Sequence, residues 1–125
     1  MKVLVVDDEQ DVEFLFQQRF RKEIRAGQID LEFALSGEAA LDSLETRGRA
    51  GRELILSDIN MPGMNGIELL RIVKQRYPDL KVFMITAYGD EHNYTTAMEN
   101  GADDYFTKPL EFEELKGKIA RILSH

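Results

Sequence analysis

The chain contains no cysteine and only two histidines, His92 and His125, among its 125 residues. The lack of cysteine excludes disulfide bonds and thiolate metal sites. The two histidines are far apart in the sequence, which argues against a histidine-based zinc site. A long block of basic residues is also missing, and the formal net charge is −7. A chain with this charge gains little from a phosphate backbone, so direct nucleic-acid binding is disfavoured.

Long hydrophobic runs are missing as well. The longest apolar runs are far too short to cross a bilayer. A strand-like run begins so close to Met1 that no signal peptide is expected. A length of 125 residues suits one ordinary domain with a single core. We therefore expect one soluble, cytoplasmic domain over residues 1–125, with no membrane partner and no direct nucleic-acid partner.

Five short apolar runs recur along the chain, and segments with helical periodicity separate them. In the first such segment, Val12, Leu15, Phe16 and Phe20 share one helical face. Strands that alternate with helices are typical of βαβ units and a parallel sheet. The first, third and fourth runs are continuously apolar, which predicts strands covered on both faces, whereas the second alternates and indicates an edge strand. We predict an α/β fold with five helices on the two faces of a five-stranded parallel sheet, whose strands are residues 3–6, 31–35, 54–56, 81–86 and 104–107.

Polar residues stand at the ends of four of the predicted strands. In an open parallel sheet, binding sites form at the carboxyl ends of the strands. We therefore expect three carboxylates, one hydroxyl and one ammonium group to meet at a single edge of the sheet. The residues are Asp7 and Asp8 after the first strand, Asp58 after the third, Thr86 after the fourth and Lys108 after the fifth.

Three neighbouring carboxylates repel one another unless a cation or a proton lies between them. Mg²⁺ is the cation that fits best, because it binds a few carboxylates, keeps several waters and shares phosphate oxygens. Asp7 and Asp8 are then metal ligands, directly or through water. Asp58 can act as a nucleophile, as carboxylates do in aspartyl-phosphate enzymes. Lys108 would neutralise charge on a transferring phosphoryl group, and Thr86 would donate a hydrogen bond.

Each of these residues also has a simpler explanation. Asp8 can favour the start of a helix, Asp58 can be a loop acid, and Thr86 is a β-branched residue that suits a strand. Lys108 can be a solvated side chain. Tyr105, which lies within the fifth predicted strand close to Lys108, can be a core aromatic. Their joint placement at four strand ends nevertheless favours a functional site.

The chain also has a short basic run in its first helical segment. The run consists of Arg19, Arg21, Lys22 and Arg25. It predicts a solvated helix face, and the docking of an acidic partner is the alternative.

The sequence resembles the response-regulator receiver domains of two-component signalling. The resemblance extends from Val3 to about Leu123 and is carried by "VLVVDDE", "LILSDINMPGMNGIELL", "MITAYGD" and "GADDYFTKPL", in the order and spacing of that family. It implies a flavodoxin-like strand order of 2-1-3-4-5 and a cis bond between Lys108 and Pro109. The resemblance implies that Asp58 is the phosphoacceptor and that Lys108 is the active-site lysine. It implies that Mg²⁺ is bound by Asp7, Asp8, Asp58 and the backbone carbonyl of Asn60. Thr86 and Tyr105 would be the switch residues, and Ala87 the small residue beside the phosphoryl group.

The resemblance further implies a signalling switch that takes a phosphoryl group from a histidine kinase or a histidine phosphotransfer protein. Such a domain is not an enzyme with a separate substrate, although it catalyses its own phosphorylation and dephosphorylation. Asn60 and Tyr88 would influence the lifetime of the acyl phosphate. The output would be an effector protein or a further domain, read through the fourth helix, the fifth strand and the fifth helix. The sequence does not indicate an oligomeric state.

Three other functions can be weighed against this one. An aspartyl-phosphate phosphatase of the haloacid-dehalogenase type needs a second aspartate two residues after its nucleophile, and here that position is Asn60. A pseudo-receiver that only binds partners would be expected to lack Asp58, the acidic pair or Lys108. Flavin binding by the same fold is disfavoured, because acids follow the first strand where a phosphate cradle needs glycine and hydroxyl residues.

Overall fold

The computed structural model describes residues 1–47, 51–87 and 91–123. Strands and helices alternate along most of the chain. Among the described residues, no helix has the length and apolar character that crossing a membrane requires. The elements are β1 (Lys2–Val6), α1 (Asp11–Arg19), α2 (Arg21–Arg25), β2 (Asp30–Ala34), α3 (Gly37–Arg47), β3 (Arg52–Asp58), α4 (Gly66–Arg76), β4 (Lys81–Thr86), α5 (Glu91–Glu99), β5 (Asp104–Thr107) and α6 (Phe112–Leu123).

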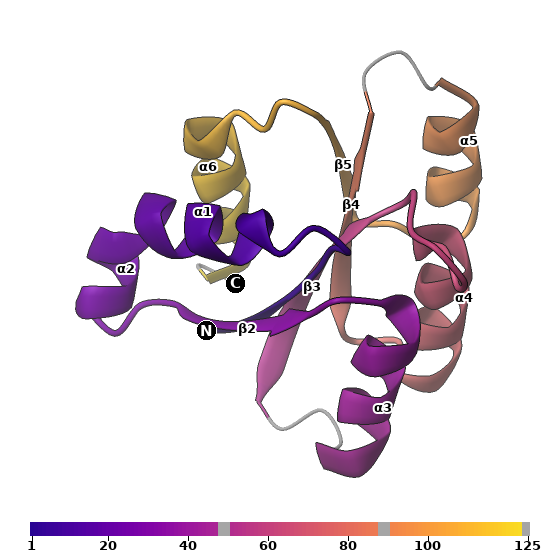
Figure 1. Ribbon diagram of the computed structural model, residues 1–125, viewed down its shortest axis with the longest axis horizontal. Helices are drawn as coiled ribbons and strands as arrows, with labels where there is room; N and C mark the ends of the chain where they lie inside the picture. Colours follow the sequence, from indigo (N-terminus) through magenta and orange to yellow (C-terminus); the bar gives the residue numbers. More distant parts are fainter. Residues whose placement is uncertain (48–50, 88–90, 124–125) are drawn as a thin grey trace.

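The five strands form one parallel sheet in the order β2-β1-β3-β4-β5 (Figure 1). This confirms the predicted order and the prediction that the alternating second strand lies at an edge. The register pairs Val6 with Ser57 and Asp58 with Ile85, so the ends of β1, β3 and β4 lie side by side. Thr86 pairs with Thr107, which brings the end of β5 to the same edge. We call this side of the sheet, where the carboxyl ends of the strands lie, the C-terminal edge; it differs from the outer edge formed by β2.

Helices cover both faces of the sheet and create two apolar layers. In Figure 1, α1, α2 and α6 lie on one side of the sheet, and α3, α4 and α5 lie on the other. Alternate residues of each strand supply the two layers, because successive side chains of a strand point to opposite faces. Leu4 and Ile55 belong to the layer under α3–α5, whereas Val3 and Leu56 belong to the layer under α1 and α6.

The structure corrects the predicted number of helices. Five were predicted, but the described residues form six, because the first helical segment is interrupted at Phe20. Phe20 has φ −102° and ψ 16°, outside the α-helical region. Its ring is fully buried, stacks on Phe16 and meets the edge of Phe112. We attribute the interruption to this packing, which hydrophobic periodicity does not encode.

Leu15 departs from the predicted buried face of the same segment. Val12 is partly buried and Phe16 is fully buried, but Leu15 keeps 38% of its surface exposed. The reason is a groove that opens between α1 and the start of α6, and Leu15 forms part of its wall.

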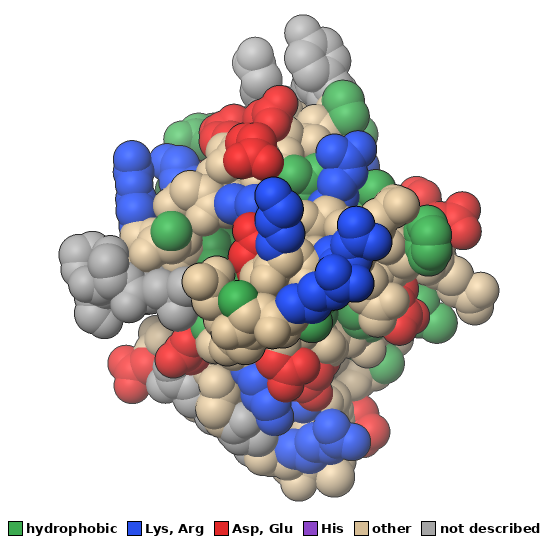
Figure 2. Space-filling view, turned by 90° about the vertical axis from the view of Figure 1, so that its left-hand side faces the viewer, with side chains coloured by type: hydrophobic (Ala, Val, Ile, Leu, Met, Phe, Trp, Pro, Cys, Tyr) green, Lys and Arg blue, Asp and Glu red, His purple; other side chains and the backbone are tan. Residues whose placement is uncertain are grey.

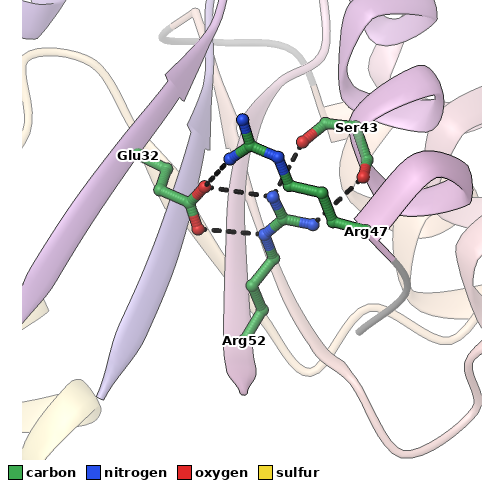
Figure 3. Close-up of polar contacts among 4 residues, drawn as sticks. All are labelled: Glu32, Ser43, Arg47 and Arg52. Carbon is green, nitrogen blue, oxygen red and sulfur yellow. Dashed lines mark hydrogen bonds and ion pairs between the residues drawn. The ribbon is translucent and has the colours of Figure 1, made fainter. Parts of the chain in front are cut away.

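A buried arginine ties β2, β3 and α3 together at the opposite end of the sheet. The Arg52 side chain is fully buried, and its Nε and Nη2 donate to the two carboxylate oxygens of Glu32, each at 3.0 Å. Nη2 also donates to Ser43 Oγ at 2.7 Å. Figure 3 shows these side chains meeting, with Arg47 approaching Glu32 from α3. The hydrogen bond from Arg52 lowers the pKa of Glu32. The stabilisation from this pair is therefore complete above the ordinary glutamate pKa of 4.5 and is lost as pH falls through the lowered value.

Replacing Arg52 by alanine is expected to lower the free energy of unfolding by about 3–5 kcal/mol, because Glu32 loses its buried partner. Arg47→Ala is the matched control. Its side chain is 67% exposed and lies 3.6 Å from Glu32, so a loss below about 1 kcal/mol is expected. Chemical denaturation of the two variants at neutral pH measures the difference. Equal losses would contradict the central place of Arg52 in this cluster.

Candidate functional site

Three carboxylates meet at the C-terminal edge of the sheet, as predicted. Asp7 and Asp8 follow β1, and Asp58 is the last residue of β3. One carboxylate oxygen from each lies within 4.8 Å of the others. Asp7 and Asp58 are buried, with 7% and 5% of their surface exposed, whereas Asp8 is open to solvent. The Asp7 carboxylate also accepts the backbone N–H of Glu9 at 2.9 Å, which fixes the turn that leads into α1.

Lys108 brings a positive charge to this cluster from the end of β5. Its Nζ donates to Asp58 Oδ2 at 3.3 Å and lies 3.5 Å from Asp7 Oδ2. Burial raises the pKa of Asp58, and the neighbouring Asp7 adds to this, whereas Lys108 opposes it. Burial alone would lower the pKa of Lys108, but Asp58 and Asp7 outweigh it and raise that pKa. The ammonium group therefore keeps its charge beside the two buried carboxylates.

Thr86 supplies a buried hydroxyl at the end of β4. The residue has no exposed surface, and its Oγ1 has no hydrogen-bond partner among the described residues. A buried hydroxyl without a partner costs about 1–3 kcal/mol. Such a group suits a site in which a hydrogen-bond acceptor arrives only in another state of the protein.

Tyr105, which the resemblance names as a switch residue together with Thr86, lies outside the carboxylate cluster. It lies on β5, pairs in register with Met84 and is partly buried. Its ring meets that of Tyr94 on α5 edge to face, with centroids 5.0 Å apart. Tyr94 was not singled out in the sequence. The signal in the sequence was an aromatic residue within an otherwise polar helical stretch, residues 91–96.

The segment between β3 and α4 holds Asp58 in place. The backbone of Asn60 lowers the pKa of Asp58, which favours the charged form of this carboxylate, although burial raises that pKa more strongly. Asn65 caps α4, because its side chain accepts the N–H of Glu68 at 3.0 Å. The N–H of Gly66 donates to the carbonyl of Ile59 at 2.9 Å. These bonds close the segment over the end of β3.

Gly66 is required by the close approach of α4 to the end of β3. A Cβ at this position would overlap the carbonyl oxygen of Asp58 and lie 2.8 Å from Ile59 Cα. Backbone atoms cannot move away cheaply, so Gly66→Ala is expected to lower the free energy of unfolding by about 3 kcal/mol.

Gly117→Ala is the matched control, because a Cβ there meets nothing within 4 Å. Gly117 lies inside α6, so alanine should stabilise the protein by about 1 kcal/mol. Denaturant unfolding measures both variants. A Gly66→Ala protein as stable as the wild type would show that the approach of α4 to the end of β3 leaves room for a side chain at this position.

The structure thus brings Asp7, Asp8, Asp58 and Lys108 together. Thr86 lies at the same edge. The side chain of Asn60 is exposed, and Ala87 is exposed beyond the end of β4. Tyr88 lies outside the described residues. The predicted cis bond between Lys108 and Pro109 is confirmed.

A groove of about 450 Å³ borders this cluster and was not predicted from the sequence. We call it the α1–α6 groove. Asp7 and Lys108 line it where it meets the C-terminal edge, and Leu15 and Arg19 line it along α1. The wall on the other side includes Phe112, at the start of α6. The groove therefore offers a partly apolar approach to the buried carboxylates.

Comparison with known proteins identifies the family. A family described as "Response regulator receiver domain" matches residues 3–120. The chain is 38% identical over 120 residues to the response regulator protein FleR of Pseudomonas aeruginosa. It is 34% identical over 123 residues to the DNA-binding transcriptional regulator NtrC of Proteus hauseri. These matches cover 96% and 98% of the chain, respectively, and 24% of each relative.

Solved structures agree with this assignment. A response regulator receiver domain protein from Clostridium thermocellum superposes with a TM-score of 0.86 at 26% identity, over 98% of this chain and 94% of that one. A CheY-like receiver domain protein from Methanospirillum hungatei gives 0.85 at 29% identity, over 98% and 93%. The chain belongs to the response-regulator receiver domains, and it spans about a quarter of the length of the curated relatives named above.

Proposed function

We propose that residues 1–125 act as one phosphoacceptor switch, with Asp58 as the residue that is phosphorylated. The supporting observation is a nearly buried carboxylate at the end of a central strand, between a second carboxylate and an ammonium group. An Asp58 carboxylate oxygen attacks the phosphorus of a phosphohistidine. The new O–P bond forms as the N–P bond breaks, and the electron pair of that bond returns to the imidazole nitrogen. The products are an acyl phosphate on Asp58 and a free histidine.

The neighbouring side chains have distinct roles in this proposal. Lys108 neutralises charge on the incoming phosphoryl group, and Thr86 donates its unpaired hydroxyl to a phosphoryl oxygen after transfer. Asp7, Asp8, Asp58 and the Asn60 carbonyl would hold Mg²⁺. The donor set fits, because three carboxylates and a carbonyl are oxygen ligands of the kind that this ion prefers. Mg²⁺ would supply charge neutralisation of the phosphoryl oxygens.

The partners follow from this role. The donor is a histidine kinase or a histidine phosphotransfer protein in the cytoplasm, and the α1–α6 groove offers it a route to Asp58. The change after phosphorylation is read on the face formed by α5, β5 and α6, by an effector protein or by a further domain. Relatives named as transcriptional regulators support an output of this kind. Hydrolysis of the acyl phosphate resets the switch, at a rate that Asn60 and Tyr88 influence.

A phosphatase of the aspartyl-phosphate type is a weaker alternative. It needs a general acid two residues after the nucleophile, whereas Asn60 occupies that position and its side chain is exposed. A pseudo-receiver is also weaker, because Asp58, Asp7, Asp8 and Lys108 all lie together.

Acetyl phosphate tests the proposed function without any protein donor. Incubation with acetyl phosphate and Mg²⁺ is expected to add one phosphoryl group per chain, and the product should be labile to alkali and hydroxylamine, as acyl phosphates are. Intact-mass spectrometry with and without a chelator measures the addition. A chain that stays unmodified under both conditions would overturn the proposal.

Millimolar Mg²⁺ is expected to raise the melting temperature of the unphosphorylated protein. Asp7, Asp8 and Asp58 repel one another when folded, and an ion that binds only the folded state stabilises it by mass action, by about 1–3 kcal/mol at high saturation. Thermal melts of the wild type and of Asp8→Asn test this expectation. Asp8→Asn should melt higher than the wild type without metal and respond less to Mg²⁺. Identical responses of the two proteins would argue against a metal site at this cluster.

A further inference from the structure

A basic surface lies on α1, α2 and α6, although the chain as a whole carries a net charge of −7. Figure 2 shows Lys and Arg side chains gathered across the middle of this face, with Asp and Glu side chains above and below them. We define the basic surface by Arg19 on α1, Arg21, Lys22 and Arg25 on α2, and Lys116 on α6. Four of the five residues are exposed, and Lys116 is partly buried.

Two of these cations are held by the packing beneath them. The Arg19 guanidinium lies 5.4 Å from the centre of the Phe112 ring. Lys116 Nζ lies 5.3 Å from the centre of the Phe20 ring and 3.2 Å from a Glu23 carboxylate oxygen. Cations that already stand over aromatic rings lose little side-chain freedom when an anion arrives. The edge of the basic surface is therefore preformed.

The other three cations are not neutralised by neighbouring side chains. Within the described part of the chain, Arg21, Lys22 and Arg25 form no ion pair, whereas Lys116 pairs with Glu23. Elsewhere, Lys74 and Lys81 share Asp103, and Arg76 pairs with Glu45. The positive charges on α2 therefore face solvent, whereas those of Lys74, Arg76 and Lys81 on α4 and β4 are paired with acidic side chains.

The basic surface adjoins the α1–α6 groove, because Arg19 belongs to both. The groove reaches from Asp7 and Lys108 along α1 to Arg19, and α2 follows two residues later. A protein that enters the groove to reach Asp58 would extend over α2. Such a protein would meet the carboxylate cluster at one end of the groove and the basic surface at the other. The opposite charges at the two ends would fix its orientation.

The shape of the charge pattern favours a compact acidic partner over a long polyanion. Glu111 and Glu113 line the same groove as Arg19, and acidic side chains border the basic surface on two sides in Figure 2. A DNA duplex or an anionic membrane would reach past the five cations and meet these acids. An acidic patch on a protein would not need to do so.

We propose that the phosphoryl donor carries an acidic surface which docks on Arg21, Lys22 and Arg25 while its phosphohistidine reaches Asp58. This inference rests on the proposed function. The attraction between the two surfaces accelerates their encounter, and because both are exposed, salt screens it.

The test uses the variant R21Q/K22Q/R25Q and the matched control R71Q/R76Q/K81Q, which removes the same charge from α4 and β4. The protein donor is the autophosphorylated histidine kinase fragment that transfers fastest to the wild type within a panel of such fragments. At low salt, transfer to R21Q/K22Q/R25Q is expected to be slower on the order of tenfold, and its dependence on salt should be weaker. The control should behave as the wild type, and circular dichroism verifies that all three proteins are folded.

Acetyl phosphate separates this inference from the proposed function, because it needs no docking surface. It should label the wild type and both variants at equal rates. Equal transfer from the kinase fragment to all three proteins overturns the inference and leaves the proposed function intact. Labelling by acetyl phosphate with no transfer from any fragment overturns the inference together with the assignment of a phosphohistidine donor. Binding of the wild type, but not of R21Q/K22Q/R25Q, to a DNA duplex or to phosphatidylglycerol vesicles at physiological salt also overturns it, in favour of that ligand.

Discussion

Asp58→Asn is expected to abolish phosphorylation by acetyl phosphate. The amide oxygen of asparagine is a poor nucleophile, and the other carboxylates of the cluster are placed differently. Asp7 is engaged by the Glu9 N–H, and Asp8 is exposed to solvent. Asp58, in contrast, is the last residue of β3, the middle strand of the sheet, and its carboxylate lies 3.3 Å from Lys108 Nζ. The loss should therefore be complete rather than shared among three acids.

Two measurements complete this experiment. Asp79→Asn replaces an exposed aspartate that follows α4 and should take up one phosphoryl group, as the wild type does. Asp58→Asn should still fold, because the substitution removes one charge from a repelling cluster and preserves the size of the side chain. A folded Asp58→Asn protein that keeps the full phosphoryl mass would contradict the assignment of Asp58.

The edge that carries the site could be predicted from the sequence because strand ends are encoded locally. An apolar run followed by acids, as at Val6 and Asp7, marks both the strand and the point where it stops. Parallel connections then bring such ends to one edge, so Asp7, Asp58 and Lys108 could be placed together without coordinates. The same argument did not place the ring of Tyr105 against Tyr94, since that contact depends on the orientation of α5.

Other features depend on packing between distant segments. The interruption at Phe20 arises from its contacts with Phe16 and Phe112, and the second of these residues lies on the last helix. The buried pair of Arg52 and Glu32 could not be predicted, because an arginine at the start of a strand is ordinarily solvated. The unpaired state of the Thr86 hydroxyl is likewise visible only once the neighbours of β4 are known.

Thr86→Ala is expected to be phosphorylated at Asp58 and yet to fail to switch. Phosphorylation adds roughly one negative charge and three acceptor oxygens at Asp58. Thr86 ends the strand next to β3, and its hydroxyl is buried and free of partners among the described residues. If it turns toward a phosphoryl oxygen, it vacates space beside Met84, the residue that pairs with Tyr105. Tyr105 is partly buried and can then move inward, away from Tyr94.

The conformations with Tyr105 outward and with Tyr105 inward must lie close in free energy if phosphorylation of Asp58 is to change which one is populated. Moving a population from 1:99 to 99:1 needs about 5.5 kcal/mol of differential interaction. A hydrogen bond to a charged group contributes about 1.5–3 kcal/mol, so Thr86 would supply a large share of that difference. Thr86→Val removes the hydroxyl and keeps the branched shape. It should stabilise the unphosphorylated protein, because a buried polar group without a partner is lost, and it should fail to switch as Thr86→Ala does.

Tyr105→Trp provides the reporter, since the chain has no other tryptophan. Fluorescence is measured with and without beryllofluoride, a mimic of the phosphoryl group, in three backgrounds: Thr86 intact, Thr86→Ala and Thr86→Val. Beryllofluoride should shift the emission only where Thr86 is intact. Thr46→Ala, an exposed threonine near the end of α3, is the control and should keep the full shift. An equal shift in all of these proteins would show that Thr86 does not couple Asp58 to Tyr105.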